Sequence, residues 1–232
     1  MANLITVARL LLLFVVIWLI YLDDATVLAW CMLLVAVVFV SDGVDGYVAR
    51  KRGSTSTFGA VFDIAGDRIV ENVLWVVFAH LEVIPLWVPL LVITRGSIVD
   101  ALRSLSYSEG MTAFGERTMM RSAFTRWLTA GRFMRGLFGY AKAAGFVFLT
   151  GLYAQEIEEP AGGWLGDLYD VDAFEVFGWG LVWLAVALTI VRGLPVVYDA
   201  LDYVRARGEA GAPTPTATVP PQNAPGATRT SG

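Results

Sequence analysis

Six long apolar stretches dominate the chain, and short polar or charged segments separate them. A helix rises roughly 1.5 Å per residue, so stretches of this length can cross a hydrocarbon layer of about 30 Å. The first stretch has no small-residue cleavage site, and we expect it to be retained. The pattern predicts an all-α, polytopic membrane protein with six transmembrane helices, near residues 4–22, 26–42, 60–81, 84–105, 136–155 and 174–200.

Composition agrees with this pattern. Of 232 residues, 56% are hydrophobic and only 16% are charged, which excludes an ordinary soluble domain. The single cysteine, Cys31, lies in an apolar run and is expected to be a small buried side chain. The expected surroundings are a lipid bilayer, and no nucleic-acid partner is expected.

Charged residues are segregated between the connecting segments. Arg50, Lys51 and Arg52 follow the second stretch, and five arginines follow the fourth, whereas residues 156–172 are acidic and contain no Lys or Arg. The positive-inside rule then puts both termini, the second loop and the fourth loop in the cytoplasm. We expect an integral protein of the cell (inner) membrane.

Two segments differ from the apolar stretches. Residues 108–130 alternate arginines with large apolar side chains, which predicts a helix lying in the cytoplasmic interface between the fourth and fifth spans. Residues 208–232 are rich in Pro, Ala and Thr, which is typical of disorder. The expected domains are a membrane catalytic domain at 1–207 and a disordered tail at 208–232.

Four aspartates stand beside the ends of apolar helices. Asp42 and Asp45 are three residues apart, and Asp63 and Asp67 are four apart, so each pair shares one helix face. A charged residue at mid-membrane costs about 2.5 to 3.5 kcal/mol, so four carboxylates require positive charge nearby. Carboxylates without histidine or cysteine suit Mg²⁺ or Mn²⁺.

The segment between the two pairs favours a phosphate ligand. Gly46 and Gly59 leave room for close approach, and Arg50 and Lys51 supply positive charge. The third stretch begins near Gly59, and a helix N-terminus attracts anions. Together with divalent ions, these features indicate a phosphate or pyrophosphate site.

The same residues resemble a known family, the CDP-alcohol phosphotransferases. The signature of that family is Asp, two residues, Asp-Gly, two residues, Ala-Arg, eight residues, Gly, three residues, Asp, three residues and Asp. All eight specified positions are present at residues 42–67. The six-span hydropathy extends the resemblance, with lower specificity, over residues 1 to about 205.

The resemblance implies a reaction and assigns roles. An alcohol hydroxyl would attack the β-phosphorus of CDP-diacylglycerol, and CMP would leave. Two divalent ions would be held by the four aspartates, with Asp67 also the general base. The residues implied to surround the CDP group are Gly46, Ala49, Arg50 and Gly59.

The acceptor is expected to be glycerol 3-phosphate. Asn3, Thr6 and Arg9 are in register with the opening segment of phosphatidylglycerophosphate synthases, which the chain resembles most. Arg68 stands where those enzymes usually carry lysine, and inositol phosphate, inositol or another alcohol stays open as acceptor. Basic residues are required for any phosphorylated alcohol. The acceptor-phosphate candidates are Arg9, Arg95, Arg103, Arg132, Arg135 and Lys142.

Several alternatives accompany these assignments. The aspartates could be helix caps, or could line the path of a cation transporter, although the last two spans offer no acidic residue at mid-depth. Arg9 could extend to the interface, and Asp100 could pair with Arg103.

Small residues are also concentrated in the fifth span. We expect them to allow close helix contact, and a homodimer like those of the family is compatible with them. They are Gly136, Gly139, Ala143 and Gly145.

Overall fold

The computed structural model describes residues 2–52, 57–108, 131–157, 159–160 and 162–209. Within these ranges the chain is helical and has no strands, which confirms the all-α prediction. Each of the six apolar stretches coincides with a long helix. The helices are α1 (Ala2–Ile20), α2 (Ala25–Arg52), α3 (Thr57–His80), α4 (Trp87–Ser108), α6 (Arg132–Glu156), α7 (Trp164–Tyr169) and α8 (Asp172–Glu209). Most of the expected interfacial segment, residues 109–130, and the tail from residue 210 lie outside the described residues.

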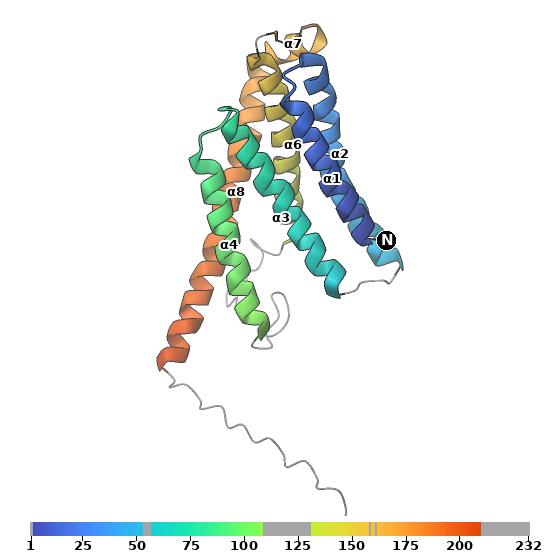
Figure 1. Ribbon diagram of the computed structural model, residues 1–232. Helices are drawn as coiled ribbons and strands as arrows, with labels where there is room; N and C mark the ends of the chain where they lie inside the picture. The colour runs from blue at the N-terminus through green and yellow to red at the C-terminus, as the bar shows by residue number, and fades with distance from the viewer. Residues whose placement is uncertain (1, 53–56, 109–130, 158, 161, 210–232) are drawn as a thin grey trace, which may run out of the picture.

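The six long helices form a closed ring. Around the ring α1 packs against α2, α2 against α6, α6 against α8, α8 against α4, α4 against α3, and α3 against α1. The short helix α7 packs on α6 and α8 at one end of the bundle (Figure 1). The beginning of α1 and the end of α8 both lie towards the other end, where α2 also ends and α3 begins (Figure 1).

Aromatic side chains fill the interior of the ring. The Phe146 ring of α6 lies 4.6 Å from the Trp75 ring and 6.1 Å from the Phe78 ring, both of α3, and 5.5 Å from the Phe39 ring of α2, measured between centroids. Trp75, Phe78 and Phe146 are almost completely buried. Large rings at these separations contribute burial and favourable ring contacts, so this cluster ties α2, α3 and α6 together.

Acidic residues shape the turn between α1 and α2. Asp23 has a left-handed backbone conformation, with φ of 50°. The Tyr153 hydroxyl donates a hydrogen bond to Asp23 Oδ1 at 2.5 Å, and the Val27 N–H donates to Asp24 Oδ1 at 2.9 Å near the start of α2. Asp24 therefore supplies the acceptor that the first turn of α2 needs.

The helix α7 lies within the acidic segment 156–172, where the sequence pattern predicted no helix. Its Tyr169 hydroxyl donates a hydrogen bond to the Phe148 carbonyl at 2.8 Å. Burial raises the pKa of Tyr169 above its ordinary value. Six residues are too few to show a helical period, which is why the pattern did not indicate this element.

The sequence predicted close helix contact at the small residues of α6. The structure shows such contact at one of the glycines and not at two others. A Cβ added at Gly145 would lie 3.4 Å from the Val182 side chain of α8, so close contact is confirmed there. The prediction was wrong for Gly136 and Gly139 within this chain, because a Cβ on either would meet no described atom within 4 Å. Both glycines are exposed, and Gly139 lines a cavity of the bundle.

The outer surface of the bundle is apolar. The side chains of Leu11, Trp18 and Trp30 are each 64% exposed, and many other large hydrophobic residues are similarly placed. A contiguous apolar surface of this kind is unstable in water and fits contact with lipid. Within the described residues, Phe133–Glu156 and Asp172–Pro195 are long and apolar enough to cross a membrane, and Leu4–Ile20 and Ala25–Ser41 are shorter apolar helices. These features fit a membrane protein.

Two glycines in α8 provide a test of the packing. A Cβ on Gly178 would overlap the Phe148 ring, whereas a Cβ on Gly180 would meet no described atom within 4 Å. We predict that Gly178→Ala lowers the free energy of unfolding by about 1 to 3 kcal/mol through overpacking. Gly180→Ala is the matched control and should not lower the thermal unfolding temperature in detergent, because alanine favours a helix more than glycine does. Equal stability of the two variants would contradict the α6–α8 contact.

Candidate active site

Two of the four predicted aspartates face one buried cation. Asp63 and Asp67 lie one turn apart near the start of α3, and Arg9 comes from α1. Arg9 Nη2 lies 2.8 Å from Asp67 Oδ1 and 3.8 Å from Asp63 Oδ1. The Arg9 side chain is 2% exposed, whereas those of Asp63 and Asp67 are 43% and 49% exposed. The buried guanidinium thus holds two partly exposed carboxylates towards a common point.

Gly66 lets α1 approach α3 closely at this point. A Cβ at Gly66 would lie 2.7 Å from Thr6 Cγ2 and 3.1 Å from Arg9 Nη2. Thr6 is itself buried, so its methyl group has little space into which to move. A residue without a side chain between Asp63 and Asp67 is therefore needed for Arg9 to reach both carboxylates.

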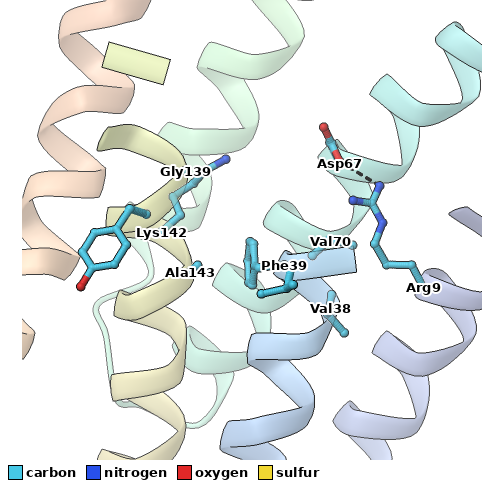
Figure 2. A pocket seen from close by; sticks show the side chains of 10 residues that line it. Arg9, Val38, Phe39, Asp67, Val70, Gly139, Lys142 and Ala143 are labelled. Carbon is cyan, nitrogen blue, oxygen red and sulfur yellow. Dashed lines mark ion pairs between the residues drawn. The ribbon is translucent and has the colours of Figure 1, made fainter. Parts of the chain in front are cut away.

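A cavity of about 320 Å³ extends from this ion pair. Figure 2 shows Arg9 and Asp67 on one side and Lys142 of α6 on the other, with Phe39 and Val70 between them. The cavity therefore has apolar walls and charged groups at opposite sides. That combination suits a ligand with a phosphate and an apolar part.

Lys142 belongs to a chain of charges that joins three helices. Lys142 Nζ donates a hydrogen bond to Glu71 Oε2 of α3 at 2.9 Å. Arg68 Nη1 lies 3.9 Å from the same oxygen. Arg68 also contacts both carboxylate oxygens of Asp100 in α4, through Nε and Nη2, each at 3.2 Å. Positive and negative groups thus alternate from α4 through α3 to α6.

For the remaining residues of the signature, the structure gives the position of the backbone in α2 and α3. Asp42 and Asp45 belong to the last part of α2, and Gly59 to the first turn of α3. The side chains of residues 42–58 lie outside the described part of the chain, so the facing of the two aspartate pairs stays a prediction. The same is true of the predicted CDP-binding residues Gly46, Ala49 and Arg50.

The structure separates the acceptor-phosphate candidates. Arg9 and Lys142 line the same cavity. Arg95 of α4 lies instead against α8, where a Cβ on Gly193 would be 2.7 Å from Arg95 Nε. Arg135 is exposed near the start of α6. The side chains of Arg103 and Arg132 are not among those described.

One alternative from the sequence is corrected by these contacts, and a second residue gains an unexpected partner. Arg9 does not extend to an interface, because its side chain is buried against Asp67. Asp100 has Arg68, 32 residues earlier, as an ion-pair partner, and its expected pairing with Arg103 stays a prediction because the Arg103 side chain is not among those described. The sequence rule that favours i, i+3 pairs on one helix could not indicate this contact between helices.

Glu71 and Arg192 were missed by the sequence reasoning. Glu71 follows Asp67 by four residues and so lies on the same face of α3, which was a usable signal. Arg192 of α8 places its guanidinium carbon 4.9 Å from the centroid of the Phe138 ring, and Lys142 Nζ lies 4.3 Å from that centroid. Two cations from different helices therefore contact one ring. Phe138 and Lys142 are four residues apart on α6, a local signal, whereas no local pattern indicates the contact from Arg192.

The carboxylate oxygens of Asp63 and Asp67 are of the kind that bind a divalent ion, but two residues do not make a complete site. Asp63 and Asp67 present hard oxygen atoms to one cationic nitrogen, as ligands of Mg²⁺ or Mn²⁺ would. Among the described side chains there is no group of three or more His, Cys, Asp or Glu residues that could hold a metal ion. The side chains of Asp42 and Asp45 are not among those described, so their part in a metal site stays a prediction.

The close approach of α1 and α3 can be tested at Gly66. We predict that Gly66→Ala lowers the free energy of unfolding by about 1 to 3 kcal/mol, because the new methyl group would displace Thr6 or Arg9. Gly96→Ala is the control, since its Cβ would lie 3.7 Å from Arg68 Nη1, at ordinary contact distance. Thermal unfolding of both purified variants measures the difference, and a fully stable Gly66→Ala protein would contradict the contact.

Comparison with known proteins places this site in a family. A family model described as CDP-alcohol phosphatidyltransferase matches residues 1–191. A Rickettsia typhi protein named CDP-diacylglycerol--glycerol-3-phosphate 3-phosphatidyltransferase is 22% identical over 191 residues, which are 82% of this chain and 91% of that protein. A Streptomyces coelicolor protein named cardiolipin synthase (CMP-forming) is 26% identical over 169 residues, 70% of this chain and 66% of that protein.

Shorter matches are more similar. A Haemophilus influenzae protein with the same name as the Rickettsia relative is 33% identical over 98 residues, 41% of this chain and 50% of that protein. The chain spans only 40% of the length of the mycobacterial relatives that it matches at 31% identity. The family match covers the helices that carry Arg9, Asp63, Asp67 and Lys142. The chain therefore belongs to the CDP-alcohol phosphatidyltransferase family.

Proposed function

We propose that the protein transfers a phosphatidyl group from CDP-diacylglycerol to glycerol 3-phosphate and releases CMP. The observation that carries this proposal is the cavity between Asp67 and Lys142, with Asp63 and Asp67 directed at one buried cation. The family match over residues 1–191 supports the donor and the reaction class. The name of the Rickettsia typhi relative supports the acceptor.

The reaction exchanges one phosphorus–oxygen bond for another. The acceptor hydroxyl oxygen forms a bond to the β-phosphorus of CDP-diacylglycerol, and the bond from that phosphorus to the CMP oxygen breaks. Asp67 accepts the hydroxyl proton as general base, and CMP carries away the electron pair of the broken bond. The half-exposed Asp67 carboxylate on the cavity wall is accessible to such a hydroxyl.

Divalent ions complete the proposed site. Asp42, Asp45, Asp63 and Asp67 would hold two ions of Mg²⁺ or Mn²⁺. When bound, such ions neutralise the diphosphate and stabilise the charge that develops on CMP. The CDP group would lie against Gly46, Ala49, Arg50 and Gly59, where α2 ends and α3 begins.

The acceptor phosphate is assigned to the cationic side chains of the cavity. Lys142 is the leading candidate, because it lies across the cavity from Asp67 (Figure 2). Arg9 pairs mainly with the carboxylates of Asp63 and Asp67. It lines the cavity beside Asp67 and would approach a phosphate from that side. The remaining candidates lie outside the described cavity lining and are kept as proposals for the approach to it: Arg95, Arg103, Arg132 and Arg135.

We further propose that six helices span the cell membrane with the site and both termini on the cytoplasmic side. The closed ring of helices and their exposed apolar side chains support six spans. Arg50, Lys51 and Arg52 end α2, and Arg132 and Arg135 begin α6, at the end of the bundle opposite the acidic segment that carries α7 (Figure 1). A homodimer is retained as a proposal, supported by the exposed Gly136 of α6.

The alternative of a cation transporter is not favoured by the interior. A transport path would have to continue from Asp67 past Glu71 towards α7. The buried rings of Trp75, Phe78 and Phe146 fill the bundle beyond that depth. The charged groups therefore end in a packed aromatic core, as expected for a site on one side.

A second acceptor, phosphatidylglycerol, is favoured by one observation. The Streptomyces coelicolor relative is named as a CMP-forming cardiolipin synthase. Cardiolipin contains two phosphatidyl groups joined through glycerol, so a phosphatidyl acceptor that already carries one such group fits this name. The apolar side chains Val38, Phe39 and Val70 in the cavity wall are compatible with a lipid acceptor. Lys142 and Arg9 favour the phosphorylated small alcohol.

The reaction is tested with purified protein, CDP-diacylglycerol and an acceptor panel. We predict that glycerol 3-phosphate yields phosphatidylglycerophosphate and CMP, and that EDTA abolishes turnover until Mg²⁺ or Mn²⁺ is restored. Inositol, inositol phosphate and phosphatidylglycerol are the comparison acceptors, with lipid products identified by mass spectrometry. Product only from another acceptor would overturn the assignment of glycerol 3-phosphate, and metal-independent turnover would overturn the metal site.

The roles of the two described aspartates are separable. We predict that Asp67→Asn lowers CMP release by about 100-fold or more at any metal concentration, because both a metal ligand and the general base are lost. Asp63→Asn should instead raise the Mn²⁺ concentration needed for half-maximal rate and recover partly at high Mn²⁺. Thermal unfolding checks that both variants fold. Unchanged turnover in Asp67→Asn would refute its role as base.

A further inference from the structure

The proposed function uses Lys142 but leaves its carboxylate partner unexplained. Glu71 lies on α3, one turn beyond Asp67, and its side chain is only 5% exposed. An isolated carboxylate is strongly destabilised in such surroundings, so its charge must be compensated. Lys142 Nζ at 2.9 Å and Arg68 Nη1 at 3.9 Å supply that compensation.

The geometry around Glu71 restricts the position of Lys142. A lysine has a flexible side chain and an ammonium group with three donors. One donor of Lys142 goes to Glu71 Oε2, and the ammonium also lies 4.3 Å from the centroid of the Phe138 ring. These contacts come from α3 and α6, and the ammonium lies at the wall of the cavity. They leave donor capacity that can be directed at a ligand there.

Arg68 and Asp100 hold Glu71 in turn. The two-point contact between Arg68 and Asp100 fixes the guanidinium plane relative to α4. Arg68 then approaches the same Glu71 oxygen that Lys142 contacts. The charges of Arg68, Asp100, Glu71 and Lys142 sum to zero. The network therefore restricts the position of Lys142 without adding net charge beside the cavity.

We propose that Glu71 is a positioning residue that holds the Lys142 ammonium against a phosphate group of the bound substrate. This inference rests on the proposed function, since Glu71 acts through Lys142, which lines the same cavity. The shared chemistry is a phosphate oxygen, which either glycerol 3-phosphate or the diphosphate of the donor could supply. Glu71 acts only through Lys142 and does not contact the reacting atoms.

Glu71→Gln tests the proposal, because loss of the negative charge and loss of the Lys142 position change the KM of the phosphate ligand in opposite directions. Removal of a negative charge beside a phosphate site would, by Coulomb attraction alone, lower the KM for the phosphate ligand. Loss of the ion pair releases the Lys142 ammonium, and positioning therefore predicts that this KM rises about tenfold with little change in kcat. The KM for glycerol 3-phosphate and the KM for CDP-diacylglycerol are measured separately. The one that rises identifies the phosphate, and a fall or no change in both overturns the proposal.

Lys142→Met and the double variant show whether Glu71 acts through Lys142. Lys142→Met removes the cation and should raise the same KM. The Glu71→Gln/Lys142→Met protein has neither charge, and its KM should equal that of Lys142→Met alone. Multiplied effects in the double variant would overturn the proposal. If stability and KM both return to wild-type values in the double variant, the pair is only structural.

Two further proteins complete the test. Glu71→Asp keeps the charge but withdraws the carboxylate from Lys142, so the same KM should rise, and this variant serves if Glu71→Gln unfolds. Asp23→Asn is the control, because Asp23 contacts Tyr153 in the α1–α2 turn and has a left-handed backbone that Asn tolerates. Both KM values should be unchanged in that variant.

Failure of the proposed function gives a different result. Wild-type protein would then release no CMP with any acceptor. In that case, stabilisation of the protein against heat by CDP and by glycerol 3-phosphate replaces KM as the readout. Loss of stabilisation by one of these ligands in Glu71→Gln, but not in Asp23→Asn, supports the positioning role. Equal stabilisation of the wild-type and Glu71→Gln proteins overturns it.

Discussion

The buried ion pair between Arg9 and Asp67 is the contact on which the site depends. A guanidinium that is almost fully buried among apolar helices must have an anionic partner, and Asp67 Oδ1 provides it at 2.8 Å. This requirement fixes the rotation of α3 relative to α1, because Asp63 and Asp67 must face Arg9. Gly66 makes the separation between the two helices short enough. The same contact thus sets the register of the helices and aims both carboxylates.

The closed ring of helices gives the molecule two different ends. Towards α7 the interior is filled by the rings of Trp75, Phe78 and Phe146, which exclude water and ligand. Towards the start of α3 the interior is open, Asp67 and Lys142 line the cavity, and Glu71 contacts Lys142. Because unpaired charge is costly in an apolar bundle, the charged groups are confined to the open end and paired across helices.

The alternating charges from Asp100 to Lys142 connect the cavity to helix packing. Each contact crosses between elements or advances one turn along α3, so a shift of α4 or α6 would move the ammonium of Lys142 relative to Asp67. Buried ion pairs contribute little net stability compared with apolar residues of the same size. Their retention in this position is better explained by the orientation that they impose on the cavity wall.

The sequence by itself determined the six long helices of the described residues and the family, because apolar periodicity and the spacing of Asp42, Asp45, Asp63 and Asp67 are local properties of the chain. It did not determine the short helix α7. The tertiary structure decided which charges meet. Lys142 contacts Glu71 across 71 residues, and Arg68 contacts Asp100 across 32. No local period encodes such contacts, since they depend on the rotation and order of packed helices. For the same reason the sequence indicated Arg9 and Lys142 as cations near a phosphate, but only packing placed them on opposite sides of one cavity.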